Sequence, residues 1–257
     1  MNIDSPELSH IPMLRSLWQE AFGDNDAFLD TFFKTAFHPD RCRCINEDGQ
    51  ITAALYWFCC EHAGKPIAYI YAVATAKAHR GRGLCRKLLA DTHLHLTRQG
   101  YEGVLLVPGS QELFDMYEKM GYQTCSTIRQ FQCSINNKAT PEELQLCTID
   151  QYEYARLRKL LLPKGSVIQE QENLDFLETQ VRFYMGHGFL LAAHGEKDTL
   201  YGVELLGDIT AASAITHTLG FTHGTFRTPG NGKAFAMYHP LGDSTLLPPD
   251  YFGFAFD

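Results

Sequence analysis

The feature that most constrains this chain is a glycine-containing turn between an apolar strand pattern and a helix pattern, within residues 73–89. Gly81 and Gly83 lie in the turn, and the basic side chains around them are Arg80, Arg82, Arg86 and Lys87. Glycines let a backbone approach an anion, and the first turn of a helix offers unpaired N–H groups and positive potential. The segment predicts an anion site suited to a pyrophosphate, although the same residues would also make a plain turn with a solvated helix end.

Two known phosphate loops do not fit this turn. The chain contains no Gly-x-x-x-x-Gly-Lys-Ser/Thr sequence, so a P-loop is excluded. The run from Gly81 to Arg86 also fails the Gly-x-Gly-x-x-Gly pattern, because Arg86 takes the place of the third glycine. A Rossmann dinucleotide site is therefore a poor alternative.

The residues before the turn predict two helices followed by three strands. Apolar residues recur at helical spacing from Ser9 to Phe37, with a helix stop at Gly23 and a new helix start after it. Strand patterns then cover residues 41–46, 51–61 and 67–75, with an Asp-Gly turn signal between the first two. We expect these three successive strands to pair antiparallel.

The residues after the turn complete a first unit of α/β (α+β) class. We expect a helix at 83–99, a buried strand at 103–107, a helix at 111–120 and a strand at 122–135. The order of strand, helix and strand around the turn predicts parallel pairing at that point. The expected fold is a mixed, mostly antiparallel central sheet flanked by helices, which closes near residue 136.

The second half of the chain resembles a weaker copy of the first. After a polar linker at 136–141 we expect helices at 149–162, 174–186 and 209–219, strands at 189–194, 200–206, 221–228 and 233–238, and a final strand in the aromatic tail 248–257. A faint repeat appears when Gly121-Tyr122 is laid on Gly220-Phe221. We therefore expect two domains, 1–137 and 138–257, of which the second is smaller and degenerate.

The run Arg80-Gly81-Arg82-Gly83-Leu84-Cys85 resembles motif A of the GCN5-related N-acetyltransferases (GNAT), whose signature is Gln/Arg-x-x-Gly-x-Gly/Ala at the start of a helix. Cys85 departs from the final small residue of that signature. Glu112–Tyr122 is similar to a second family segment, Phe/Leu-Tyr-Glu-Lys-x-Gly-Phe/Tyr. The resemblance covers residues 1 to about 135 and extends to the order of the elements, so it implies the GNAT fold.

The resemblance implies acetyl-CoA as the cosubstrate. In the family, the pantetheine arm pairs with main-chain groups of the strand before motif A, which here corresponds to Val73, Ala74 and Thr75. The pyrophosphate would rest on the motif itself, which comprises Arg80, Gly81, Arg82, Gly83, Leu84, Cys85 and Arg86. The second unit has no Arg-Gly-x-Gly loop, so only the first is expected to bind acetyl-CoA and catalyse.

The resemblance implies Tyr117 as the general acid, because a tyrosine at this place approaches the coenzyme sulfur in the family. A phenol with an ordinary pKa near 10 stays protonated at neutral pH and can protonate a departing thiolate. The alternative is a core tyrosine, since Leu113, Met116, Tyr117 and Met120 form one apolar helical stripe. The faint repeat places Thr216 at the corresponding position of the second unit.

The general base stays open at this point. Family members use a glutamate, a water chain or, in tandem enzymes resembling the enhanced intracellular survival acetyltransferases, the carboxylate at the end of the chain. That parallel points to Asp257, although we expect no counterpart of the sterol-carrier-like third domain of those enzymes in these 257 residues. The simpler alternative is a final strand that buries Phe252, Phe254 and Phe256.

Charge and cysteine content exclude several classes of partner. The net charge of −8 leaves no domain-wide basic surface, which argues against nucleic acid and against an aminoacyl-tRNA-dependent transferase. The longest apolar stretch, Ile51–Cys60, is about half of what a membrane helix needs, and we see no secretion signal.

Eight cysteines without a Cys-x-x-Cys pair indicate reduced thiols and a cytoplasmic protein. His93 and His95 point in different directions on a helix, so we expect no metal site.

The resemblance implies an N-acetyltransferase in which a small-molecule or peptide amine attacks acetyl-CoA directly in a ternary complex. Most of the negative charge falls after residue 140, which would suit a cationic acceptor such as a polyamine, aminoglycoside or basic peptide end. The rival prediction is a non-catalytic acyl-CoA-binding or regulatory module. The acceptor, the acyl chain preference and the oligomeric state stay open.

Overall fold

A computed structural model describes residues 1–135 and 144–256, and the chain in it divides into two compact units. Unit 1 comprises Met1–Gln123 and Met237–Pro248, and unit 2 comprises Thr124–Ala236 and Pro249–Asp257. This division differs from the expected boundary at 137, and the linker expected at 136–141 lies outside the described residues. Within the described ranges, no helix is both long and apolar enough to cross a membrane.

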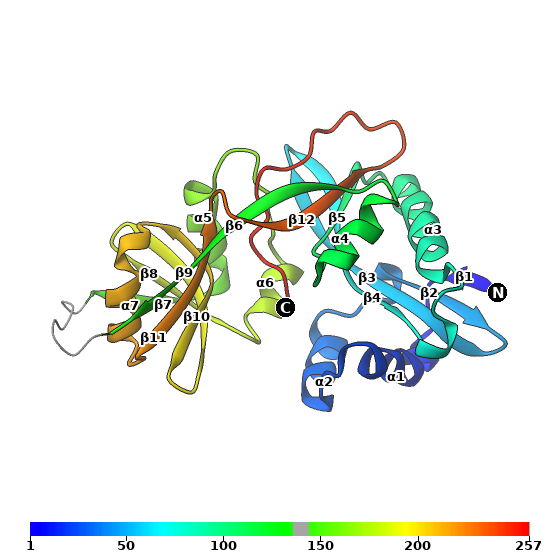
Figure 1. Ribbon diagram of the computed structural model, residues 1–257, viewed down its shortest axis with the longest axis horizontal. Coiled ribbons are helices and arrows are strands. Elements are labelled where there is room, and N and C mark those ends of the chain that lie inside the picture. Colours follow the sequence, from blue (N-terminus) through cyan, green and yellow to red (C-terminus); the bar gives the residue numbers. More distant parts are fainter. Residues whose placement is uncertain (136–143, 257) are drawn as a thin grey trace. The chain divides into compact units, whose positions relative to one another are not determined.

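Unit 1 is a mixed sheet with helices on both faces (Figure 1). Its strands are β1 (Asn2–Asp4), β2 (Cys42–Glu47), β3 (Gln50–His62), β4 (Lys65–Thr75), β5 (Gly103–Leu106) and the end of β12 (Lys233–Pro240), in the spatial order β1-β2-β3-β4-β5-β12. Its helices are α1 (Ile11–Phe22), α2 (Asp26–Thr35), α3 (Leu84–Arg98) and α4 (Gln111–Glu118). Neighbouring strands are antiparallel except for β4 and β5, which are parallel, as expected.

Local signals account for the first elements of unit 1. Helix α1 ends at Gly23, whose φ of +79° favours glycine, and Asn25 caps α2 by accepting from the N–H of Phe28. Asp48 and Gly49 both have positive φ in the two-residue turn between β2 and β3, where Asp-Gly is a preferred pair. The two helices and three antiparallel strands expected here are therefore confirmed.

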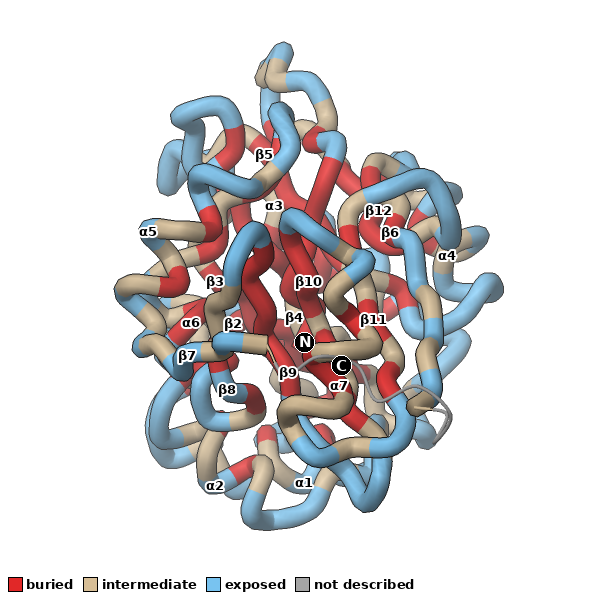
Figure 2. The backbone as a smooth tube through the Cα atoms, turned by 90° about the vertical axis from the view of Figure 1, so that its left-hand side faces the viewer, coloured by how far each residue is buried: buried red, intermediate tan, exposed pale blue. Residues whose placement is uncertain are grey.

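The core of unit 1 lies on both faces of its sheet, because alternate residues of a strand point to opposite sides. Leu55 and Trp57 of β3 share a buried cluster with Leu84 and Leu88 of α3. The intervening Tyr56 packs instead against the aromatic residues of α1 and α2, among them Trp18 and Phe32. The strands are accordingly mostly buried and the outer helix faces exposed (Figure 2).

The strand that closes the first sheet is not the expected one. The stretch 122–135 forms β6 (Gln123–Ser134), but Met237–Pro240 of β12 pairs with β5, and nearly all of β6 belongs to unit 2. Gly103 explains why β12 fits here, since a Cβ at this position would lie 2.4 Å from the ring of Tyr238. The closing strand therefore comes from far along the chain.

Unit 2 repeats the order and the pairing of unit 1. Its other strands are β7 (Leu146–Ile149), β8 (Arg182–Gly186), β9 (Phe189–Glu196), β10 (Thr199–Gly207) and β11 (His223–Pro229), in the spatial order β7-β8-β9-β10-β11-β6. Its helices are α5 (Gln151–Leu161), α6 (Glu172–Leu177) and α7 (Ala212–Thr218). Among the described strand pairs of unit 2, only β10 and β11 are parallel, which matches β4 and β5 of unit 1.

This topology corrects the register of the faint repeat. Helix α7 connects the two parallel strands of unit 2 as α3 does in unit 1, so Gly220 corresponds to Gly100 rather than to Gly121. The N–H of the residue after each of these glycines donates to a carbonyl five residues back, and all three glycines have positive φ. The sequence match with Gly121 therefore reflects a shared way of ending a helix and not a shared place in the fold.

Two other expectations for unit 2 were wrong. The helix expected over 174–186 ends at Leu177, because Arg182–Gly186 pairs with both β7 and β9 as a strand. The described part of the tail, 248–256, forms no strand, and Tyr251 makes an isolated bridge with Ser166. Phe252, Phe254 and Phe256 are nevertheless buried, and so are the residues between them.

Candidate active site

The turn before α3 has an open backbone. Gly81 and Gly83 have φ of +76° and +75°, and a Cβ on either would meet nothing within 4 Å, so backbone conformation rather than crowding favours glycine. Gly83 is the N-cap of α3, and no side chain caps this helix. The N–H groups of the first turn of α3 are therefore left for a ligand or solvent, as an anion site requires.

Basic side chains surround this turn, and two of them are engaged within the protein. Arg80 donates from Nε to the carbonyl of Thr75 at 3.1 Å. The guanidinium of Arg82 forms two hydrogen bonds with the carboxylate of Glu47, at 2.9 and 3.0 Å. Arg86 is exposed in the first turn of α3. The structure thus brings the predicted basic residues together, and it adds Glu47, which the sequence did not indicate.

On the side that faces β5, no strand that the structure describes pairs with the end of β4. The two strands pair only where Ile67–Tyr69 runs beside Gly103–Leu105. On its other side β4 pairs with β3 as far as Thr75. Val73, Ala74 and Thr75 therefore follow the point where the parallel strands part, next to the open turn.

A bulge lies at the start of these three residues. Ala72 and Val73 of β4 together face Leu55 of β3, and Ala72 has φ of +49°. A non-glycine residue in this region costs about 1 to 3 kcal/mol, and such strain is concentrated at functional sites. No glycine or proline marks the bulge in the sequence, so the expectation of a regular strand missed it.

Tyr117 lies on α4 with its ring in the core, and its hydroxyl donates no hydrogen bond within the described residues. The side chain is 6% exposed, and its ring centroid is 5.6 Å from that of Tyr122. Its hydroxyl donates to no residue that the structure describes. Burial, and to a smaller extent the neighbouring Cys85, raises the pKa of Tyr117, which keeps the phenol protonated. Tyr117 is thus a core residue whose protonated hydroxyl donates no hydrogen bond to the described part of the chain.

Cys85 lies in the first turn of α3, close enough to Tyr117 to affect the pKa of its phenol. Burial raises the pKa of its thiol to about 11, so the thiol is neutral at physiological pH. It also packs against the same buried cluster as α3 and α4. Cys85, which stands where the family signature has Gly or Ala, therefore leaves the turn intact and adds contacts to the buried cluster.

The predicted base is not placed by the structure. Asp257 lies outside the described residues, and the preceding residues, Tyr251–Phe256, are buried within unit 2. The structure brings the other predicted residues to one end of β4 and α3.

The histidines of α3 have separate surroundings, as their spacing predicts. Nε2 of His93 lies 2.8 Å from the hydroxyl of Tyr122, and its ring packs on His239. Burial, with a smaller effect of His239, lowers the pKa of His93 to about 4. His95 lies instead against Trp57. Among the residues described, no group of three or more potential metal ligands is found.

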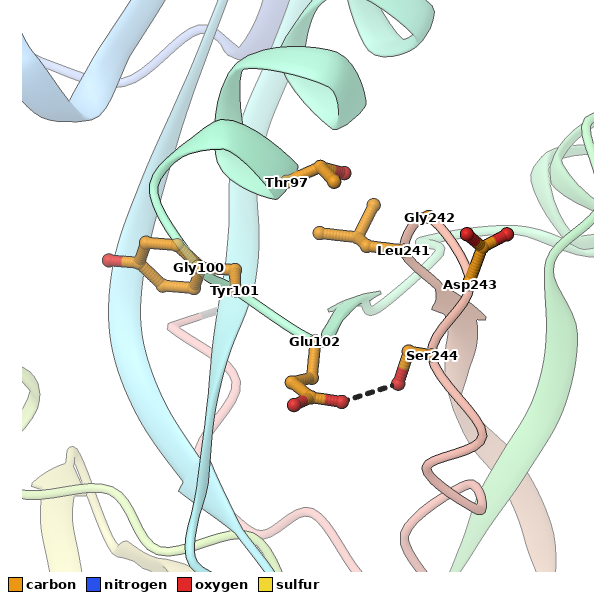
Figure 3. A pocket seen from close by; sticks show the side chains of 8 residues that line it. All are labelled: Thr97, Gly100, Tyr101, Glu102, Leu241, Gly242, Asp243 and Ser244. Atoms are coloured by element: carbon orange, nitrogen blue, oxygen red, sulfur yellow. Dashed lines mark hydrogen bonds between the residues drawn. The ribbon is translucent and has the colours of Figure 1, made fainter.

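A pocket of about 320 Å³ opens at the other end of α3 (Figure 3). Its lining comprises Thr97, Gly100, Tyr101, Glu102, Leu241, Gly242, Asp243 and Ser244, and Ser244 donates to Glu102 at 2.7 Å. Helix α3 has 15 residues, which corresponds to a length of about 22 Å. The pocket is therefore separate from the turn at Gly83.

The first half of the chain matches a known protein family. Residues 2–125 match the family model described as an acetyltransferase (GNAT) domain. No curated protein matches the sequence. The family match covers the open turn, the free end of β4 and Tyr117.

Solved structures share the fold over both units. A GCN5-related N-acetyltransferase from Anabaena variabilis has a TM-score of 0.72 at 14% identity, over 92% of this chain and 72% of its own. A probable N-acyltransferase from Enterococcus faecalis has a TM-score of 0.70 at 14% identity, over 93% and 72%. Eis1 from Mycobacterium abscessus has a TM-score of 0.67 at 10% identity, over 93% and 74%. At these identities the likeness concerns the fold alone.

Proposed function

Residues 2–125 belong to the GCN5-related N-acetyltransferase family, and from this premise we propose that the chain transfers an acetyl group from acetyl-CoA to a primary amine. The observation that carries the proposal is the open end of β4 beside the uncapped start of α3, with the protonated hydroxyl of Tyr117 in the same unit. We further propose that it works in the cytoplasm on a small-molecule or peptide amine.

The residues of unit 1 fit the two parts of the coenzyme. The unpaired side of β4 at Val73, Ala74 and Thr75 offers main-chain groups to an amide-containing arm such as pantetheine. The turn from Arg80 to Arg86 offers N–H groups, positive φ glycines and basic side chains to a pyrophosphate. Acetyl-CoA supplies an activated acetyl group as a thioester.

The proposed reaction is direct attack of the neutral amine on the thioester carbonyl. A main-chain N–H at the bulge of β4 polarises the carbonyl oxygen, as in an oxyanion site. Holding both reactants together supplies a large part of the acceleration. The C–S bond then breaks, and Tyr117 donates its proton to the leaving thiolate. The nitrogen loses one proton as the amide forms, and this proton, passed through solvent, restores the phenol of Tyr117.

For the base that deprotonates the ammonium form of the acceptor, we retain the terminal carboxylate of Asp257 as one proposal. A glutamate or an ordered water chain would serve the same purpose. Replacing the terminal residue distinguishes these proposals, because only the first requires a carboxylate at the end of the chain.

We propose that the second half, expected at 138–257, is a degenerate GNAT-like domain that contributes to acceptor choice. The repeated topology of unit 2 supports a common origin with unit 1. The counterpart of the phosphate turn, between β10 and α7, contains Asp208, whose carboxylate accepts from the N–H and the hydroxyl of Thr210 at 2.9 and 2.6 Å. A carboxylate in this place repels a pyrophosphate, so we expect no coenzyme in unit 2.

The test is release of the coenzyme thiol from acetyl-CoA across a panel of amines that includes polyamines, aminoglycosides and peptides with a free amino terminus. The proposal predicts amine-dependent thiol release with at least one class. Tight binding of acetyl-CoA with no thiol release from any amine would instead support the non-catalytic acyl-CoA-binding module.

A further inference from the structure

The last described segment, Tyr251–Phe256, is buried in unit 2 without belonging to a helix or a strand. A buried peptide group needs hydrogen-bond partners, and this segment obtains one through the N–H of Val167, which donates to the carbonyl of Tyr251 at 2.8 Å. In Figure 1 the segment is the red end of the chain, which runs to α6, and the rings of Phe256 and Phe176 lie 5.2 Å apart.

Side chains of unit 2 provide further main-chain partners. The N–H of Phe254 donates to Oε1 of Gln169 at 3.0 Å, and Nε2 of the same amide donates to the carbonyl of Phe254 at 2.9 Å. The N–H of Phe252 donates to the hydroxyl of Ser126 at 3.1 Å. The amide of Gln169 thus binds the segment as a neighbouring strand would, and Gln169 itself is fully buried.

A buried ion pair contacts two aromatic side chains of the segment, those of Tyr251 and Phe254. Arg158 of α5 donates to both carboxylate oxygens of Glu204 of β10, at 2.7 and 2.9 Å. Tyr251 donates its hydroxyl to the same carboxylate at 3.0 Å, and the guanidinium lies 4.3 Å from the ring centroid of Phe254. A buried ion pair is costly unless its remaining sites are satisfied, so the segment and the pair depend on each other.

Gly253 makes the recognition selective. A Cβ at this position would lie 1.8 Å from Oε1 of Glu204 and 2.8 Å from a terminal nitrogen of Arg158. Both atoms are held in the buried ion pair and have little room to move. The segment therefore requires a glycine between Phe252 and Phe254.

The position of this groove within unit 2 corresponds to the face of the unit 1 sheet that α1 and α2 cover. Glu204 follows an extra residue of β10, Val203, where the strand bulges as β4 does at Ala72. Helices α5 and α6 hold the places in the topology that α1 and α2 hold in unit 1. The segment covers the face of unit 2 that corresponds to the α1 and α2 side of β4.

We propose that unit 2 contains a peptide-binding groove whose ligand is the chain's own segment Tyr251–Phe256. The groove binds the segment through the Gln169 amide and the ion pair of Arg158 and Glu204. It leaves no room for a side chain at Gly253, so it selects glycine there. Most of its contacts come from side chains rather than from a continuous sheet, so the groove also binds the same sequence supplied as a separate peptide.

The test uses the full-length Gly253→Val variant, in which the chain's own segment no longer fits. A fluorescent peptide of sequence Tyr-Phe-Gly-Phe-Ala-Phe-Asp is titrated into this variant and into the unaltered chain. We expect saturable binding to the variant and none to the unaltered chain, with at least about tenfold weaker binding of a matched peptide that has alanine in place of glycine. Equal binding of both peptides, equal binding to both proteins, or no binding to a folded variant would overturn the proposal.

Amide hydrogen exchange in the full-length chain keeps the proposal testable if that variant does not fold. We expect Gln169→Ala to speed exchange at the N–H groups of Phe252 and Phe254 by about tenfold or more. The control is Ile215→Val, which weakens the core of unit 2 at α7. If both variants speed exchange at these amides equally, the segment opens only with the whole unit, and the proposal fails.

Discussion

The turns before α3 in unit 1 and before α7 in unit 2 hold the same place in the topology and have opposite chemistry. The first has two positive-φ glycines, basic side chains and an uncapped helix start at Gly83. The second has no basic residue, and Asp208 accepts the hydrogen bonds of Thr210. A shared backbone plan therefore does not make a shared site, because a few residues at one turn determine which unit accepts an anion.

The largest expected effect comes from giving unit 1 the carboxylate of unit 2. Gly83→Asp keeps a residue type that tolerates positive φ and places a negative charge at the start of α3. We expect the dissociation constant of acetyl-CoA to rise by about a thousandfold, or roughly 4 kcal/mol, in a calorimetric titration.

Gly83→Asn is the matched control, because it has the same shape without the charge. It should weaken binding by much less than the aspartate does. Equal losses in the two variants would mean that backbone conformation, and not charge, distinguishes the two turns.

The next effect concerns Tyr117, which has no counterpart in the described part of unit 2, because no helix at the place of α4 lies between β11 and β12 there. Tyr117→Phe should lower kcat by about a hundredfold and leave the affinity for acetyl-CoA nearly unchanged, since only the proton donor is lost. Thiol release under saturating coenzyme measures this.

Tyr122→Phe is the control for Tyr117, because it removes a neighbouring buried hydroxyl that bonds His93 instead. Its turnover should stay near that of the unaltered enzyme once the protein is folded. Unaltered turnover in Tyr117→Phe would remove Tyr117 from the mechanism.

Acidification should destabilise unit 1 through His93. Its pKa is lowered to about 4 in the folded protein, so between pH 6.5 and pH 4 the unfolded chain takes up a proton that the folded chain does not. The free energy of unfolding should fall by about 2 kcal/mol from pH 7 to pH 4.5, measured by urea unfolding followed in unit 1.

His93→Gln should flatten this dependence, whereas His223→Gln, at an exposed position of unit 2, should leave it unchanged. The same slope in all three proteins would assign the acid sensitivity to other groups.

The smallest effect concerns Arg82, since its side chain is half exposed and already paired with Glu47. Arg82→Glu should raise the dissociation constant of acetyl-CoA by about tenfold at low salt and by less at high salt, as expected for a screened charge. Glu47→Gln, which frees the guanidinium, should leave binding equal or slightly tighter. Equal affinity in Arg82→Glu at every salt concentration would contradict a pyrophosphate contact.

The sequence was sufficient where structure follows from neighbouring residues. Gly23 and Asn25, the Asp48-Gly49 turn and the glycines before α3 each act within a few residues, and the elements predicted from them are confirmed. Apolar spacing likewise placed Tyr117 on a buried face of α4.

Features that depend on distant partners were missed. Arg182–Gly186 is a strand because β7 and β9 lie on either side of it, although its local spacing resembles a helix. The bulge at Ala72 depends on the register with Leu55. Neither the pairing of β12 with β5 nor the burial of the tail without a strand leaves a local signal.

The central claim is that the turn before α3 binds the coenzyme and the turn before α7 does not. Amide hydrogen exchange of the full-length chain with and without coenzyme A tests this claim most directly. We expect protection of amides in the turn from Arg80 to Arg86 and along Val73–Thr75, with no change between Gly207 and Ala212. Protection at the second turn as well as the first would contradict the account. So would binding without protection at the first turn.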